Sequence, residues 1–143
     1  MLDSAPGKLT SFTLDRRIRP VAYIETIHIK DGVECDVYVF KGDKTCDLAI
    51  VRVEAGHKTP LQKVLKGNKT IEGFLKGRAT LTVTSEDGGI DSYRFDSDDD
   101  RGREVIVSVG QTMQWLADES TRLVFYEICD PPYEEGRYEN LPE

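Results

Sequence analysis

The sequence predicts an all-β protein built as a sandwich or a closed barrel. Short runs rich in β-branched and aromatic residues follow one another along the chain, and turns containing glycine separate them. Apolar residues nowhere recur with a helical period over three turns behind an N-terminal cap. The chain has 143 residues, the size of one domain, and is long enough to bury a core without disulfides.

The strands are expected between recognisable turns. Asp31-Gly32 is a two-residue hairpin signal between strands at residues 21–30 and 34–40. Residues 78–84 alternate between apolar and polar side chains, as in a strand with one buried face. Further strands are expected at residues 48–53, 70–75, 90–95, 104–109, 111–116 and 122–129. About 15 residues at the start and about five at the end are expected to be loosely held.

Composition limits the partners that the protein can have. The net charge is −7 and the pI is 4.9, which argues against nucleic-acid binding, because that needs a basic surface. No apolar run approaches the roughly 20 residues that span a bilayer, and the N-terminus lacks the pattern of a secretion signal. Three cysteines without a C-x-x-C pair fit a reducing compartment. We therefore expect a cytoplasmic protein that binds neither nucleic acid nor membranes.

Charge is distributed unevenly along the chain. Residues 86–104 carry a net charge of −5 and residues 130–143 a net charge of −4, whereas residues 57–78 carry +5. A basic patch on an acidic protein can steer an anionic small molecule towards a site. The same lysines can instead belong to a solvated loop that keeps a strand edge soluble. The sequence leaves both interpretations open.

Two segments carry a resemblance to a known family. Residues 53–77 and 107–128 resemble the two motifs of small single-domain cupins. The first motif of that family sets His-x-His and a Glu between two glycines, and the second sets a His after a glycine. The glycine framework is matched by Gly56, Gly77 and Gly110.

The resemblance implies a fold for the whole chain. It covers residues 48–128 and implies a single cupin-type jelly-roll β-barrel, a double-stranded β-helix, over residues 1–143. Residues 129–143 would then pack on the barrel or on a dimer edge. Since cupins commonly pair edge to edge, a homodimer is expected.

The metal-ligand positions of the family hold other residues in this sequence. Counted from the framework glycines, the two histidine positions hold Gln62 and Val64, the glutamate position holds Thr70, and the last histidine position holds Thr121. These side chains are weak or impossible ligands for a divalent metal. We therefore expect no metal at the standard site and no cofactor. A displaced site built from His57, Glu72 and either Gln62 or Gln114 remains an alternative.

Glu72 is the first candidate for a catalytic group. Thr70, Glu72 and Phe74 share one face of a strand. A carboxyl on an inward, apolar face has a raised pKa and can act as a general acid or base. A register slip of one residue would turn Glu72 to solvent instead. His57 is expected as a partner base at the barrel mouth, with a surface-loop histidine as the alternative.

Six residues are candidates for ligand binding: Gln62, Thr70, Gln114, Trp115, Tyr126 and Arg137. Trp115 is the single tryptophan and offers a stacking surface, although it could also plug the core. Tyr126 and Glu127 point to opposite faces of the last long strand, and the sequence does not decide which faces the lumen. Arg137 could clamp a carboxylate or a phosphate.

The favoured function is the binding of a small polar or anionic molecule inside the barrel. A metal-independent isomerase or epimerase acting on a sugar-type substrate is one alternative, and it needs a base and an acid across the lumen. A metal-dependent enzyme with a displaced site is another. Whether the protein is an enzyme stays open at this stage, because a fold does not fix a function.

Overall fold

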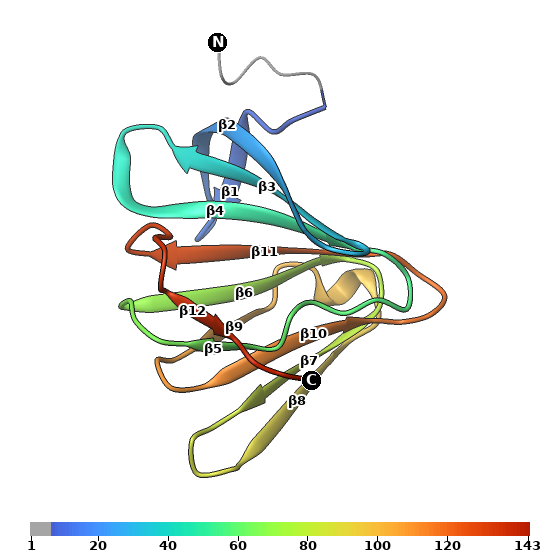
Figure 1. The fold of residues 1–143 in the computed structure, drawn as a ribbon. Helices are drawn as coiled ribbons and strands as arrows, with labels where there is room; N and C mark the ends of the chain where they lie inside the picture. Colours follow the sequence, from blue (N-terminus) through green and yellow to red (C-terminus); the bar gives the residue numbers. More distant parts are fainter. Residues whose placement is uncertain (1–6) are drawn as a thin grey trace.

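Two antiparallel sheets make up the regular structure of the computed structural model, which describes residues 7–143 (Figure 1). The all-β prediction is confirmed. One sheet has the strand order β1-β2-β3-β4-β11-β6-β9, and the other has the order β12-β5-β10-β7-β8. Their bounds are β1 Ser11–Leu14, β2 Arg17–Lys30, β3 Val33–Phe40, β4 Asp43–Val53, β5 Gln62–Val64, β6 Lys69–Lys76, β7 Ala79–Thr84, β8 Ile90–Phe95, β9 Glu104–Val107, β10 Thr112–Ala117, β11 Leu123–Asp130 and β12 Tyr138–Asn140. None of the helical structure in residues 7–143 is long and apolar enough to cross a membrane.

The local signals in the sequence explain the hairpins. Gly32 has a φ of +77°, which a two-residue turn between β2 and β3 requires and which glycine adopts without a steric penalty. In β7, buried and half-buried residues alternate, as the sequence pattern predicts. Strand β7 pairs with β10 without a register shift, so that Leu81 lies opposite Trp115.

The inner core lies between the two sheets and is built around stacked aromatic rings. Trp115 stacks on Phe125 with ring centroids 4.6 Å apart, and Phe74 stacks on Phe95 at 5.1 Å. Phe95 and Trp115 join the two pairs at 5.3 Å. Aromatic pairs at these separations stabilise a core beyond the effect of burying their area.

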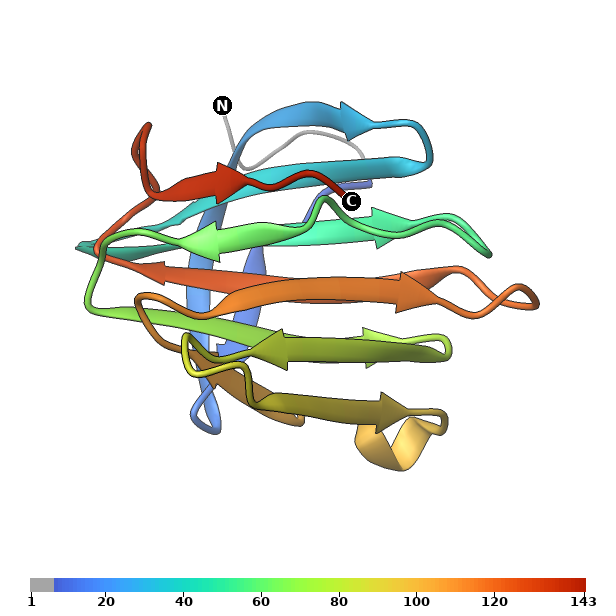
Figure 2. The same cartoon turned by 60° about the horizontal axis from the view of Figure 1, so that its bottom comes forward.

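A second core lies on the outer face of the seven-stranded sheet. Strand β1 and the first part of β2 run across the other strands of this sheet (Figure 2). Leu14 and Val21 are buried there against Tyr38, Ile71 and other residues of that face. The prediction that the first residues are loosely held is therefore wrong for Ser11–Leu14, which form β1. Residues 1–6 lie outside the described part of the chain.

The C-terminal segment adds the edge strand of the five-stranded sheet. Strand β12 pairs with β5, so that residues 138–140 are ordered rather than loose. Ion pairs hold the acidic tail against the basic segment: Lys66 lies 3.2 Å from Glu134, and Lys58 lies 3.1 Å from Glu143. The two segments of opposite net charge thus neutralise each other in part.

Candidate functional site

A cavity of about 350 Å³ opens between the two sheets, beside the aromatic stack. Trp115 and Phe125 form one wall. The other apolar walls are Ile27, Ile29, Val37, Ala49, Val51, Pro60 and Met113. Tyr133, which is 56% exposed, marks the mouth of the cavity. A mostly apolar cavity of this size with a few polar groups is typical of a small-molecule site.

Glu72 lies at the buried side of this cavity. Its strand, β6, presents Glu72 on the inner face together with Phe74, as the alternation of the sequence predicts. The residue is 1% exposed. The indole Nε1 of Trp115 donates a hydrogen bond of 2.9 Å to Glu72 Oε1, whereas Oε2 has no hydrogen-bond partner. A buried carboxyl oxygen without a partner is costly, which makes Glu72 a candidate for a functional position.

A second carboxyl group lies beside the first. Glu127 of β11 is directly opposite Glu72 of β6 in the register of the sheet. Its Oε1 accepts a hydrogen bond of 3.0 Å from the hydroxyl of Tyr138 and one of 3.6 Å from the thiol of Cys129. Burial, and then repulsion by Glu127, raise the pKa of Glu72 well above its ordinary value, and the Trp115 hydrogen bond opposes this shift. Glu72 therefore favours its protonated form more strongly than an exposed glutamate does.

Burial favours the protonated form of two thiols and one hydroxyl near the pair. Burial raises the pKa of Cys35 to about 11, and the negative charge of Glu127 adds to this shift. Burial, and then the charge of Glu127, also raise the pKa of Tyr138 and of Cys129. Among the described residues, no lysine or arginine lines the cavity. The charge of the carboxyl pair is therefore not compensated by a cation in the wall.

Two of the six predicted ligand-binding residues line the cavity. Trp115 is one, and Gln62 of β5 is the other, with its Nε2 donating a hydrogen bond of 3.0 Å to Asn140 Oδ1. Gln114, the neighbour of Trp115, points to the other face of its strand. There its Nε2 donates to the carbonyl of Thr59 at 2.8 Å and to Glu143 at 2.7 Å.

Thr70 and Arg137 form a buried contact outside the cavity. Arg137 is 1% exposed, and its Nη2 donates to Thr70 Oγ1 at 2.9 Å and to the carbonyl of Lys69 at 2.8 Å. Its Nη1 donates to the carbonyl of Pro131 at 2.9 Å. The guanidinium is therefore occupied by the chain itself, contrary to the expectation that it clamps a ligand.

His57 does not join Glu72 as a partner base. Its side chain is 43% exposed, with Nδ1 3.1 Å from the carbonyl of Ala55 and Nε2 3.9 Å from Asp31. It does not line the cavity. The framework glycine before it places His57 in a turn, so the alternative of a surface-loop histidine describes its position.

Tyr126 also lies away from the cavity, on the opposite face of β11. It packs in the outer core, and its hydroxyl donates to Glu104. The expectation that Tyr126 lines the lumen is corrected by the pleat of β11, which turns Phe125 and Glu127 inward and Tyr126 outward.

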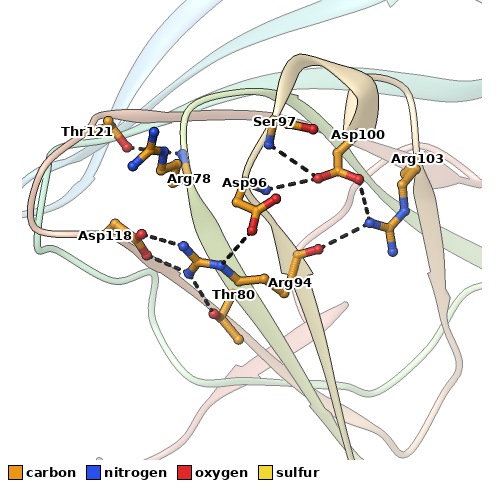
Figure 3. Close-up of polar contacts among 9 residues, drawn as sticks. All are labelled: Arg78, Thr80, Arg94, Asp96, Ser97, Asp100, Arg103, Asp118 and Thr121. Carbon is orange, nitrogen blue, oxygen red and sulfur yellow. Dashed lines mark hydrogen bonds and ion pairs between the residues drawn. The ribbon is translucent and has the colours of Figure 1, made fainter.

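The residues at the family's metal-ligand positions do not fit a divalent metal. Val64 is a buried apolar residue, and Thr70 Oγ1 is occupied by Arg137. Thr121 lies in the turn between β10 and β11, where its Oγ1 accepts the backbone N–H of Arg78 at 3.0 Å (Figure 3). Over residues 7–143, no group of three or more His, Cys, Asp or Glu side chains is arranged to hold a metal. The structure also keeps His57 and Gln114 out of the cavity, so it does not assemble the displaced site.

A second, open depression of about 640 Å³ lies on the surface near Arg78 and Thr121. Polar groups of its lining have partners in the chain: the backbone N–H of Arg78 donates to Thr121 Oγ1, and Asp96 lies 3.9 Å from Arg94 (Figure 3). Among the described residues, the unpartnered buried side-chain polar atoms are Glu72 Oε2 and Arg137 Nε, and neither belongs to this depression. The barrel cavity is therefore the candidate site.

Two residues of the candidate site are not among the candidates that the sequence gives. Glu127 was one of two open choices for the inward residue of its strand. Tyr138 lies in the C-terminal segment that was expected to pack on the barrel or on a dimer edge, and its hydroxyl donates to Glu127. The signal that would have found Glu127 is its two-residue spacing from Phe125, an aromatic residue of the inner core.

No family model matches the sequence, and no curated protein matches it. Solved structures do match. Oxalate decarboxylase from Lactobacillus farciminis is 18% identical with a TM-score of 0.66, over 80% of this chain and 32% of that one. A mutant of Bacillus subtilis oxalate decarboxylase is 22% identical with a TM-score of 0.68, over 82% and 30%. The capsular polysaccharide assembling protein CapF from Staphylococcus aureus is 12% identical with a TM-score of 0.67, over 87% and 35%.

These similarities establish the fold of the chain. It is the cupin fold, a double-stranded β-helix, as the resemblance to the cupin motifs implies. The chain spans about a third of the length of these structures. At 12–22% identity, the likeness concerns the fold and not the activity.

Proposed function

We propose that the protein binds a small molecule in the barrel cavity, through stacking on Trp115 and a hydrogen bond to Glu72. The observation that carries this proposal is the unpartnered Oε2 of Glu72, buried at a cavity that is otherwise lined mainly by apolar and aromatic groups. A ligand with a polar head and a compact apolar body would satisfy that oxygen and cover the walls. The carboxyl pair disfavours an anionic ligand, because its charge would repel a second negative group.

Filling the cavity tests this proposal. Ala49 lines the cavity and lies opposite Glu127 in the sheet register, so Ala49→Phe would place a phenyl ring in the space for the ligand. Compounds from a fragment library that bind the wild type should lose at least tenfold in affinity. Trp115 provides the readout, because its indole lies in the cavity wall and its fluorescence will respond to a bound molecule.

Ser92→Phe is the matched control, since it adds the same ring at an exposed position of β8. We expect this variant to bind fragments as the wild type does. The proposal is overturned if no fragment binds the wild type, or if Ala49→Phe binds every fragment unchanged.

Proton transfer is a second candidate function, as in a metal-independent isomerase or epimerase. The observation that favours it is the pairing of a protonated Glu72 with Glu127, which provides a general acid and a general base side by side. Such a pair can remove a proton from a C–H bond next to a carbonyl and return it to a neighbouring atom.

Deuterium exchange separates this second function from binding alone. The protein is incubated in D₂O with a set of aldoses and ketoses, and loss of C–H signals is followed by NMR. An isomerase should exchange one such proton, and both Glu72→Gln and Glu127→Gln should reduce the rate at least a hundredfold. If no sugar exchanges a proton above the protein-free rate, the isomerase function on sugars is rejected.

A further inference from the structure

We infer that the cavity selects a ligand with a cationic nitrogen, namely an organic amine with an apolar or aromatic body, held between Glu72 and Glu127. This inference rests on the proposed function and names the chemical class of its ligand. It follows from three features of the cavity: its charge, the position of the free carboxyl oxygen, and its aromatic walls.

The charge of the cavity is the first feature. Glu72 and Glu127 lie opposite each other on neighbouring strands, and no lysine or arginine of the described residues lines the cavity. A carboxyl group that is buried in its charged form needs a positive partner. Arg137 is a buried cation, but it donates to Thr70 and to backbone carbonyls rather than to either carboxyl. A cationic ligand would supply the missing positive charge.

The geometry of the pair is the second feature. Glu72 Oε1 is fixed by the indole of Trp115, and Glu127 Oε1 is fixed by the hydroxyl of Tyr138 at 3.0 Å. The Oε2 of Glu72, a residue that lines the cavity, is buried and has no hydrogen-bond partner. An ammonium group has three donors and no acceptor, and carboxylate oxygens are acceptors. The pair is therefore a better match for an amine than for a carboxylate or a phosphate.

The walls are the third feature. Trp115, Phe125, Tyr133 and Tyr138 all line the cavity, and Tyr133 stacks near Tyr138 with ring centroids 6.0 Å apart. Aromatic faces attract cations, most strongly in a desolvated site. The same rings offer stacking surfaces to a flat ligand body.

Binding of a cation should also release a proton. Burial, and then Glu127, raise the pKa of Glu72, and an ammonium group beside it would favour its ionised form. The other titratable groups that interact with Glu127 are Cys35 from β3, Asp47 from β4, Cys129 from β11 and Tyr138 from β12. His28 and Tyr133 also line the cavity, and His28 lies in an exposed part of β2.

The test uses three probes of similar shape: phenethylamine, 2-phenylethanol and phenylacetate. Affinities are measured by calorimetry at pH 7.5 in buffers of different ionisation enthalpy, which also gives the number of protons released. We expect the amine to bind at least tenfold more tightly than the alcohol, with the acid weakest, and with up to one proton released. Glu72→Gln should reduce amine affinity about tenfold and abolish proton release, while Glu127→Gln should reduce the affinity to a similar extent.

Glu104→Gln is the matched control, because Glu104 lies on the neighbouring strand and its carboxyl accepts from Tyr126 on the outer face. It should bind the amine as the wild type does. If 2-phenylethanol binds as tightly as phenethylamine, the inference of a cationic ligand is overturned while binding in the cavity stands. If none of the three probes and no fragment binds, the proposed function fails together with the inference.

Discussion

Glu72→Gln should make the protein more stable at pH 8 than the wild type, by on the order of 1–3 kcal/mol in the free energy of unfolding. The amide keeps the acceptor for the Trp115 indole and removes the ionisable group that is buried beside Glu127. Removing a group that is buried without a full set of partners is stabilising when the replacement has a similar shape. The measurement is urea denaturation of both proteins between pH 5 and pH 8.

The pH dependence of this difference has a defined sign. Folding raises the pKa of Glu72 above its ordinary value of 4.5, so the folded state favours the protonated form. The protonated form is present in both states below the ordinary pKa, and stability is lost as the pH rises towards the pKa of the folded state. The two proteins should therefore be similar near pH 5 and should diverge as the pH increases.

Glu104→Gln provides the comparison, because it removes the same charge from an exposed residue of β9. The difference in free energy of unfolding between Glu104→Gln and the wild type should not increase with pH. A difference between Glu72→Gln and the wild type that stays constant from pH 5 to pH 8 would contradict the buried, proton-holding Glu72. A loss of stability at pH 8 would contradict it as well.

The inward position of Glu72 was one of two alternatives that the sequence left open, and its two-residue spacing from Phe74 favoured it although β6 is buried on both faces. Thr70, Glu72 and Phe74 share a face, and the glycine framework fixes where this strand lies in the barrel. Trp115 could be predicted for a related reason, since a single tryptophan between strands of clear pattern is expected inside. Both residues line the cavity.

The choice between Tyr126 and Glu127 could not be made, because β11 is buried on both faces. Phe125 packs in the inner core, while Tyr126 and Ile128 pack in the outer core under β1 and β2. A strand that is covered on both faces loses the alternation that reveals its inward side. The sequence also could not predict that β1 covers the outer face of this sheet, since β1 has only four residues and becomes buried through tertiary contacts.

The role of Arg137 could not be predicted for a different reason. The sequence shows a cation in an acidic tail, and such a residue is usually exposed. Its partners are backbone carbonyls and one hydroxyl, and no sequence pattern marks a backbone carbonyl as a partner. The close approach of the guanidinium to Gly67 is likewise a property of the folded chain.

Arg137→Ala should lower the free energy of unfolding by about 3 kcal/mol or more, because it leaves buried acceptors without donors. These acceptors are the carbonyls of Lys69 and Pro131 and the hydroxyl of Thr70. Arg137→Lys keeps the charge but not the planar fork of donors, so it should recover only part of the loss. Arg101→Ala is the control, since Arg101 is exposed and also donates to a backbone carbonyl, that of Leu75 at 3.1 Å. It should change stability by less than about 0.5 kcal/mol.

The loss of stability in Arg137→Ala should be concentrated in the C-terminal segment, and it should also change the candidate site. Arg137 ties this segment to the start of β6, and the next residue, Tyr138, donates to Glu127 in the cavity. Hydrogen exchange in Arg137→Ala should therefore speed up first in β12 and in its partner β5, before β7 and β10 are affected. Without the Tyr138 hydroxyl, Glu127 loses its strongest donor, so fragment binding should weaken in the same variant. Unchanged stability together with weakened binding would mean that Arg137 contacts the ligand directly, and it would contradict the anchoring role that its buried contacts assign to it.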